Sequence, residues 1–555
     1  MKLNFKKSIC SRALAFAVLL FLMAGISACK TAKKTDDLKN LPALTLPISK
    51  EKLVIAHCMT NIIRYKNHPF EDSCNPEYYF KTGNITAPLG GLSQVYVMAD
   101  SLLSNASLEE AVAFEIKAAK KCGIDGFQFY YHLGSRTDDD IIKAYFKVAD
   151  EQKIDFKFTF CISHPKGKTE SIKIADFAER INGIFKAVGQ NNKHWLRTPD
   201  GRLLVYSWYG EDLADIPAKS NFPKPYYAAK AFQKLANAVH DKFACVYTIN
   251  QRYSKTDLNN ILDYFPAVWI WTLPYTNTYS GFEVAKACKE RNRNFTASVF
   301  NDFYTSKLLK KGTWDMYHNA ADAVKAGIDS VDRKYIPTGL SNNFRNLFDF
   351  GIKQNAQIIN VITWNDYPEG HHIAPEINHN YGFAILLNYY KSLWKGEKSS
   401  YQNKDVAIAF FKKYQSNVTP NPYNIPVVSF EKEAKPTPVE DSIEVVTLLK
   451  DSATLYINNQ RVKVAAGLKS SVVASKPGNV IVRATRSGKE IINFITPEGI
   501  TTASYRTDRL TYSFSSEFKS FHHYLFGDDK AFVSSEYSTL PLQPQFKKPT
   551  PPTSH

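Results

Sequence analysis

The chain has 555 residues, enough for two or three domains, and 44% of them are hydrophobic, which provides for a sizeable core. Its formal net charge is +17, from 70 basic and 53 acidic side chains. The basic residues are dispersed among the acidic ones, without the clustered stripe or motif that a nucleic-acid partner requires, so we expect no nucleic-acid binding. A basic surface facing a membrane or an anionic polymer is the simpler account.

Residues 1–28 have the pattern of a bacterial lipoprotein signal peptide. Four basic residues within the first twelve precede an apolar segment, 13–23, that is too short to span a membrane stably. The stretch Ile26-Ser27-Ala28-Cys29 resembles a lipobox, which predicts lipidation of Cys29. Acyl chains would hold the protein in the cell envelope, on the periplasmic face or the surface, with the outer membrane expected. An ordinary signal ending near Ala28 is the alternative, and 29–51 is a polar tether.

The remaining cysteines do not have the spacing of a metal site. No C-x-x-C pair occurs, so the sequence predicts neither a structural metal nor another cofactor. Cys58 and Cys74 could pair across a loop in an oxidising compartment, and the sequence leaves that open.

Between residues 52 and 398, short apolar runs alternate with segments of helical periodicity. The expected strands are 53–57, 126–132, 156–163, 202–209, 243–249, 267–273, 295–301 and 356–364. The expected helices are 108–122, 138–152, 174–188, 228–241, 258–264, 283–292, 344–354 and 385–395. Eight such units predict an α/β fold, a (β/α)8 TIM-type barrel. An open doubly wound sheet is the alternative, but no Gly-rich phosphate loop follows the first strand.

Active sites of such barrels lie at the carboxyl ends of the strands, and those ends are rich in polar and aromatic residues here. Aromatic faces in a cleft bury the apolar faces of sugars. The residues expected at the strand ends are His57, Tyr130, His132, Ser163, His164, Trp208, Glu211, Trp271, Asn301, Asp302, Asp366 and Glu369.

The last strand leads into Thr363-Trp364-Asn365-Asp366-Tyr367-Pro368-Glu369-Gly370-His371-His372. Packing does not require such a cluster, because buried carboxylates and imidazoles are costly unless paired. Two acids three residues apart suit glycoside hydrolysis, in which one protonates the leaving oxygen and the other activates water. A solvated loop is the structural alternative.

The composition changes after residue 398. A helix is expected over 405–414, followed by a Pro-rich linker, so that 399–440 connects two domains. Short β runs separated by turn signals predict a β-sandwich over 441–530. The Pro-rich end, 531–555, is expected to be disordered.

Four patches resemble glycoside hydrolase family 71, whose members act on α-1,3-glucan. They are Val54-Ile55-Ala56-His57, Gly123-Ile124-Asp125-Gly126-Phe127, Phe303-Tyr304-Thr305 and, most specifically, 363–371. The resemblance implies endo-α-1,3-glucanase activity with inversion, on a polysaccharide that is an α-glucan, and it places the family's two proposed catalytic acids on Asp366 and Glu369. The chain departs from the family's usual residues at Pro368, His372, Tyr130 and Ser163. The resemblance therefore supports glycosidase activity more firmly than it supports α-1,3-glucan as the substrate.

We assign Glu369 as general acid and Asp366 as base. Asp125 precedes the second strand, at the face where residues serve stability, and is expected to be structural. The residues expected to bind substrate or to tune the acids are His57, Tyr130, His132, Trp208, Glu211, Trp271, Asp302, Tyr304, Trp364, Asn365 and His371.

Three other functions fit the sequence less well. An endo-α-mannosidase-like glycosidase is the nearest competitor. A metal-dependent barrel hydrolase could use histidines at four strand ends, His57, His132, His164 and His371, but the first strand lacks H-x-H and no H-E-x-x-H occurs. A sugar-binding surface lipoprotein without activity would not need the acid pair.

Overall fold

The computed structural model describes residues 37–517 except 69–102, 104, 166, 252, 272–278, 306, 308, 318–321, 323–324, 328–329, 377–378, 416–426, 430–437 and 503–508. The predicted signal peptide, Cys29, Cys74 and the predicted disordered tail therefore lie outside the described residues. All elements discussed below belong to the unit Ala43–His555. No helix within the described residues is long and apolar enough to cross a membrane.

Eight parallel strands close into a barrel in the order β1-β10-β7-β6-β5-β4-β3-β2, which confirms the predicted fold class. They are β1 (Leu53–Met59), β2 (Gly126–Tyr131), β3 (Lys157–Ser163), β4 (Leu203–Trp208), β5 (Phe243–Ile249), β6 (Ala267–Ile270), β7 (Asn294–Val299) and β10 (Ile358–Val361). The first and last strands complete the closure, with Leu53 opposite Ile358 and Ile55 opposite both Asn360 and Gly126.

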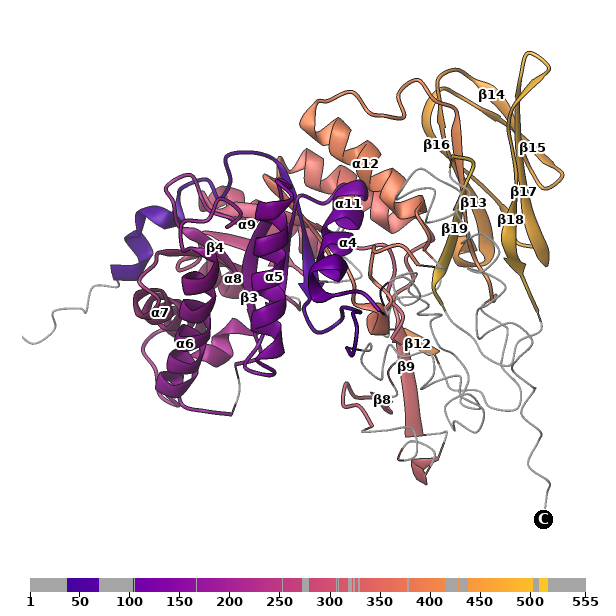
Figure 1. The fold of residues 1–555 in the computed structure, drawn as a ribbon. Helices are drawn as coiled ribbons and strands as arrows, with labels where there is room; N and C mark the ends of the chain where they lie inside the picture. The colour runs from indigo at the N-terminus through magenta and orange to yellow at the C-terminus, as the bar shows by residue number, and fades with distance from the viewer. Residues whose placement is uncertain are drawn as a thin grey trace, which may run out of the picture. The chain divides into compact units, whose positions relative to one another are not determined.

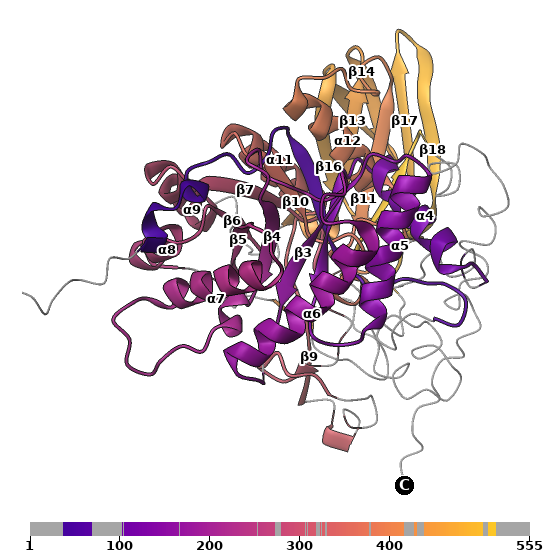
Figure 2. The ribbon, with the colours of Figure 1, turned by 60° about the vertical axis from the view of Figure 1, so that its left-hand side comes forward.

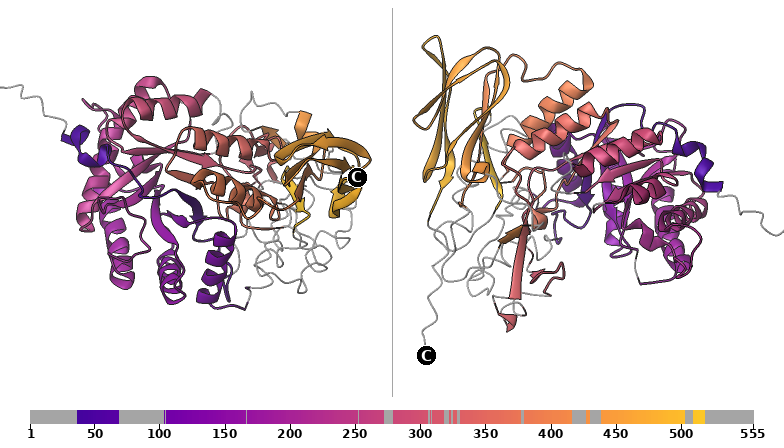
Figure 3. Two further views of the ribbon diagram at one scale, coloured as in Figure 1. Left: turned by 90° about the horizontal axis from the view of Figure 1, so that it is seen from above. Right: turned by 180° about the vertical axis from the view of Figure 1, so that it is seen from behind.

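Helices between the strands cover the outside of the barrel, as Figures 1 and 3 show. They are α4 (Leu108–Lys121), α5 (Thr137–Glu151), α6 (Glu170–Val188), α7 (Lys224–Ala238), α8 (Lys255–Leu262), α9 (Tyr279–Glu290), α11 (Asn342–Lys353) and α12 (Gly382–Lys395). Local sequence sets their starts: Ser107 and Glu110 form a capping box at α4, and Ser254 and Asp257 form one at α8.

The connection from β7 to α11 is long and carries a small sheet of its own. Strands β8 (Leu309–Lys310) and β9 (Val331–Tyr335) pair antiparallel, and β12 (Val427–Ser429) adds to β9 in parallel. A segment of the expected linker is therefore hydrogen-bonded to a loop of the barrel.

Two antiparallel sheets form the C-terminal β-sandwich, as predicted, and they face each other in Figure 2. One has the order β16-β13-β11-β19 and the other β15-β14-β17-β18. Side chains from both sheets, among them Phe411, Val445, Leu455 and Val482, make one buried core. The strands are β11 (Val406–Lys412), β13 (Ser442–Leu449), β14 (Ala453–Ile457), β15 (Gln460–Val464), β16 (Gly467–Ala474), β17 (Gly478–Arg486), β18 (Lys489–Ile500) and β19 (Thr511–Ser515).

The helix expected over 405–414 is wrong, because this segment is β11, a central strand of the sandwich. Ala407 and Phe411 point into the sandwich core, whereas Phe410 on the opposite face packs on Phe383 of α12 at 5.1 Å between ring centroids. A strand buried on both faces is apolar throughout, so period alone cannot distinguish it from a buried helix.

The same strand supplies a buried ion pair to the barrel. Nζ of Lys412 lies 3.2 Å from Oδ1 of Asp302, which follows β7, and both side chains are almost fully buried. The main-chain N–H of Thr511 in β19 also donates to Asp302. The polar end of β7 thus anchors the sandwich.

Candidate active site

The predicted acid pair lies on a closed loop that leaves the buried strand β10. The N–H of Thr363 donates to the carbonyl of His371 at 2.8 Å, and the N–H of Ile373 donates back to Thr363 at 3.0 Å. The N–H of Trp364 donates to the carbonyl of His57 at 2.7 Å, which joins this loop to the end of β1. The loop is thus held at the carboxyl end of the barrel, where active sites of this fold lie.

A tight turn inside this loop brings the two acids close together. Residues Tyr367–Glu369 form a 3-10 turn that ends at Gly370, whose φ is 69°. A Cβ there would lie 2.8 Å from the carbonyl oxygen of Tyr304, so only glycine fits. The turn keeps the chain compact between Asp366 and Glu369.

Asp366 and Glu369 both face the buried imidazole of His371. Its Nε2 lies 3.1 Å from Oε2 of Glu369 and 3.9 Å from Oδ2 of Asp366. One carboxylate oxygen from each acid and a ring nitrogen all lie within 4.8 Å of one another. His371 is fully buried, whereas the Glu369 side chain is 20% exposed, so the group is open to solvent on the Glu369 side.

The surroundings move the pKa values of the two acids in opposite directions. Burial, and after it the neighbouring Glu369 carboxylate, raises the pKa of Asp366 to about 6. Burial acts in the same sense on Glu369, but the ammonium of Lys307 and the ring of His371 outweigh it and hold its pKa well below the usual range. Nζ of Lys307 lies 2.7 Å from Oε1 of Glu369. Near pH 5 the pair therefore carries one proton, on Asp366, which is how paired catalytic carboxyls divide acid and base roles.

An aromatic wall continues from His371 and includes five of the predicted substrate-binding residues. The ring of Trp271 lies 5.7 Å from His371 and 4.4 Å from Trp208, centroid to centroid. Burial, and then the nearby His371, lowers the pKa of His57 to about 3, so that this ring is neutral. The wall comprises Trp271, Trp208, His57, Tyr130 and His132, joined by ring contacts of 4.4–5.8 Å.

Four other predicted residues make contacts away from this wall. Nε1 of Trp364 donates to Glu115 of α4 at 2.5 Å, and Asn365 bonds the main chain at Met59 and Ile62. These two residues and Tyr304, which is fully buried, hold the loop rather than face a ligand. Asp302 belongs to the ion pair with the sandwich.

Glu211 lies on the turn after β4, and burial raises its pKa. Its Oε2 accepts a hydrogen bond from the hydroxyl of Tyr247 at 3.3 Å. It follows Trp208, the last residue of β4, by three residues. Asp125 accepts from the N–H of Val54 and pairs with Lys391, which fits the structural role expected for it.

Lys307 is not among the residues predicted from the sequence. It lies two residues beyond the family-like patch 303–305 in the loop after β7. A lone lysine in a loop carries no signal of its own, and only closure of the barrel between β7 and β10 brings it to Glu369. The four histidines of the metal-hydrolase alternative do not form a ligand group within the described residues, where Tyr130 contacts the rings of His57, His132 and His164.

Comparison with known proteins gives one family match. The model of glycosyl hydrolase family 71 matches residues 348–523, which include the acid pair and every strand of the sandwich. No curated protein matches the sequence.

Several solved glycosidase structures match the chain at low identity and low TM-score. The GH99 endo-alpha-mannosidase from Bacteroides thetaiotaomicron in complex with BIS-TRIS propane is 13% identical, with 63% of this chain and 99% of that chain covered and a TM-score of 0.40. A glycosyl hydrolase family 2 member from Bacteroides cellulosilyticus is 11% identical, with 81% and 46% covered and a TM-score of 0.40. The beta-glucosidase from Thermotoga maritima with castanospermine is 10% identical, with 64% and 100% covered and a TM-score of 0.32. At these scores the likenesses do not bear on substrate.

Proposed function

We propose that the protein is a glycoside hydrolase that cleaves α-glucosidic bonds in a polysaccharide, with endo-cleavage of α-1,3-glucan as its activity. The observation that carries the proposal is the pair Asp366 and Glu369 on one imidazole, at the carboxyl end of a closed barrel. The family 71 match over 348–523 supports the reaction class. The aromatic wall beside the pair supports a sugar ligand.

The electrostatics favour acid and base roles opposite to those expected from the sequence. Asp366, which retains its proton to about pH 6, would give that proton to the glycosidic oxygen as the bond to the anomeric carbon breaks. Glu369, kept ionised by Lys307, would take a proton from the attacking water or attack the anomeric carbon itself. Lys307 and His371 are positioning residues that keep Glu369 ionised.

The stereochemical outcome follows from how far apart the carboxyls stand during the reaction. Retaining enzymes hold the two carboxyl groups ~5–5.5 Å apart and inverting ones ~6.5–9.5 Å apart. The family resemblance implies inversion, and retention is the alternative. NMR of the first-formed anomer decides between them.

A polysaccharide screen tests the substrate. Purified protein is incubated with α-1,3-glucan, other α-glucans and α-mannan, and reducing ends and product sizes are followed. We expect oligosaccharides of mixed length from α-1,3-glucan. Cleavage of α-mannan alone would promote the endo-α-mannosidase alternative, and unchanged turnover in Asp366→Asn and Glu369→Gln would overturn the glycosidase site.

Two rescue experiments test the roles. An α-glucosyl fluoride has a leaving group that needs little protonation, so it restores activity to the variant that lacks the acid. Azide restores activity to the variant that lacks the base or nucleophile. We expect fluoride rescue for Asp366→Asn and azide rescue for Glu369→Gln; the reverse pattern would reinstate the roles inferred from the sequence.

We also propose a lipid-anchored location in the cell envelope through Cys29. The lipobox-like stretch 26–29 supports it. Cys29→Ala should move the protein from the membrane to the soluble fraction. Retention of the unlipidated variant on the membrane would contradict the anchor.

A further inference from the structure

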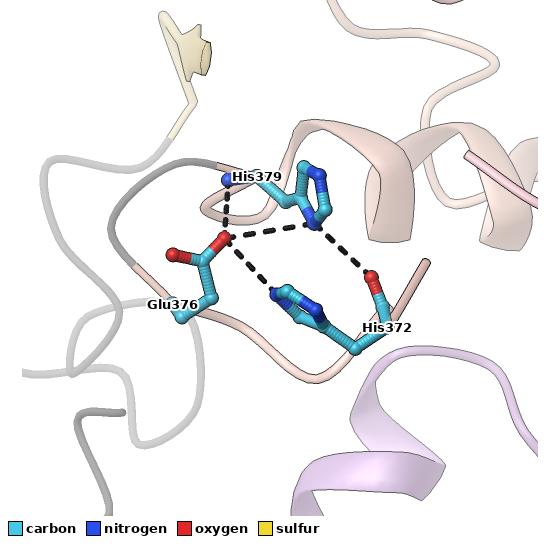
Figure 4. Close-up of side chains that lie close together, drawn as sticks. All are labelled: His372, Glu376 and His379. Atoms are coloured by element: carbon cyan, nitrogen blue, oxygen red, sulfur yellow. Dashed lines mark hydrogen bonds and ion pairs between the residues drawn. The ribbon is translucent and has the colours of Figure 1, made fainter. Parts of the chain in front are cut away.

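A second group of ionisable side chains, which has no role in the proposed reaction, lies directly after the catalytic loop. His372, Glu376 and His379 are at most 1% exposed. Both imidazoles point toward the carboxylate of Glu376 (Figure 4). One ligand atom of each lies within 4.8 Å of the other two. Two imidazoles and a carboxylate are ligands that zinc prefers.

Each of the two imidazoles places a ring nitrogen at ligand spacing from the same oxygen of Glu376. Nε2 of His372 lies 3.2 Å from Oε1 of Glu376, and Nδ1 of His379 lies 3.5 Å from the same oxygen. Zinc bonds of ~2.0–2.2 Å in tetrahedral directions place neighbouring ligand atoms roughly 3.3–3.5 Å apart. The nitrogen–oxygen distances of 3.2 and 3.5 Å are close to that range.

Hydrogen bonding among the described residues accounts for the position of His379, whose Nδ1 lies 3.1 Å from Nδ2 of Asn301 and 3.1 Å from the carbonyl oxygen of His372, but not for that of the His372 ring. Both ring nitrogens of His372 lack a hydrogen-bond partner there, although one lies 3.2 Å from a carboxylate oxygen. Buried polar atoms are rarely left unpaired, and each one that is requires an explanation. A cation between the imidazole and the carboxylate supplies one.

The groups behind the cluster orient it as second-shell groups orient metal ligands. Nε2 of His379 lies 3.5 Å from Oδ2 of the buried Asp302, and the N–H of His379 donates to Oε1 of Glu376 at 2.6 Å. With Nε2–H turned to Asp302, Nδ1 carries the lone pair of the ring and accepts from Nδ2 of Asn301 at 3.1 Å, a hydrogen bond that a metal at Nδ1 would replace. A carboxylate behind a ligating histidine is a recurrent support of zinc sites. The ammonium of Lys412 lies on Asp302 and balances its charge.

The neighbouring group Asp366, Glu369 and His371 has comparable spacing but a different charge balance. The ammonium of Lys307 already neutralises Glu369, and that group is partly open. The buried cluster is closed to substrate, so a metal there would be structural. It would tie the catalytic loop, through His372, to the sandwich, because the hydroxyl of Ser513 in β19 donates to the carbonyl of His379.

We propose that His372, Glu376 and His379 bind one divalent metal ion, with zinc as the preferred ion. The bound ion would stabilise the contact between the catalytic loop and the β-sandwich. The proposal does not depend on the proposed function. A fourth ligand would come from water or from the main chain.

Metal content and thermal stability of the full chain test the site. We expect about one zinc per chain by elemental analysis after dialysis against zinc, and a melting temperature that falls on chelation and returns with zinc alone. No stoichiometric zinc, with no change in melting temperature on titration, would overturn the proposal.

Variants locate the metal. Glu376→Gln and His372→Gln should lose the zinc. Asp302→Asn, which leaves all three ligands in place, should weaken zinc binding roughly 10–100-fold. His194→Gln removes a comparably buried imidazole elsewhere in the barrel and should retain the zinc. Zinc retained in Glu376→Gln but lost in a double variant of Asp366 and Glu369 would place the ion at the acid pair and overturn the proposal. If a ligand variant does not fold, the proposal is tested by comparing the zinc affinity of the wild-type chain with that of Asp302→Asn.

Discussion

His371 and His372 are neighbours in the chain, yet they belong to two clusters that differ in charge balance and in exposure to solvent. His371 faces two carboxyls, a lysine and a partly open aromatic wall. His372 faces Glu376 and His379 in a closed interior. In each cluster two acidic or imidazole partners surround a histidine, so residue type alone does not distinguish them.

Charge balance and access distinguish the two clusters. In the first, Lys307 fixes which carboxyl is ionised, and the proton on the other is available to a ligand. In the second cluster, the carboxylate of Glu376 lies between two imidazoles in the closed interior, where substrate cannot enter. The nearby ammonium of Lys412 pairs with Asp302 and not with Glu376. A chemical role requires exposure and a movable proton, whereas the buried cluster can only stabilise.

Removing the acids should separate the clusters most clearly. Asp366→Asn and Glu369→Gln should each lose roughly 10²–10⁴-fold in kcat, because general acid–base transfer contributes that much. Zinc content and melting temperature should remain close to those of the wild type. Loss of both activity and zinc in these variants would show that the two groups are one site.

Breaking the buried ion pair behind the second cluster should have the next largest effect. Lys412→Met leaves Asp302 charged and buried, which should cost about 3–5 kcal/mol in the free energy of unfolding, measured by denaturant titration. Lys413→Met removes the next lysine, whose pair with Glu498 is more exposed, and should cost much less. Equal losses would contradict the anchoring role of Asp302.

Lys307→Met should change the pH dependence more than the fold. In the wild type, kcat/KM should fall as pH rises through about 6, because Asp366 then loses the proton that it must donate. Without the ammonium the pKa of Glu369 rises, so activity should also be lost toward low pH, where Glu369 becomes protonated. The lost charge-assisted contact corresponds to a decrease of about ten- to a hundredfold in kcat/KM. A pH–rate profile with an unchanged acidic limb would contradict this role.

Hydrophobic periodicity and composition were sufficient to predict the barrel, because few other folds contain eight alternating strands and helices. They failed at β11, where burial on both faces removes the period that distinguishes strand from helix. At the site, the family-like stretch located Asp366, Glu369 and His371. The roles of Asp302 and Trp364 could not be predicted, because these depend on partners more than a hundred residues away in sequence.

Lys307 and the buried cluster illustrate the same limit. Lys307 has no sequence signature, and its effect on Glu369 arises only when the loops after β7 and β10 meet. The spacing of His372, Glu376 and His379 matches no motif that the sequence analysis considered, and the absence of C-x-x-C led to an expectation of no metal. Three-dimensional proximity, rather than residue spacing, reveals that cluster.

The smallest effect should come from the aromatic wall, which touches only the first cluster. Trp271→Leu removes an edge contact to His371 and a face next to Trp208, and such aromatic pairs contribute about 0.5–1.5 kcal/mol. We therefore expect KM for the polysaccharide to rise about two- to tenfold, with kcat nearly unchanged and zinc content unaffected. Phe282→Leu changes a half-exposed aromatic residue on α9 and should leave KM unchanged. If Trp271→Leu lowered kcat at constant KM, the ring would act by orienting His371 and not by binding sugar.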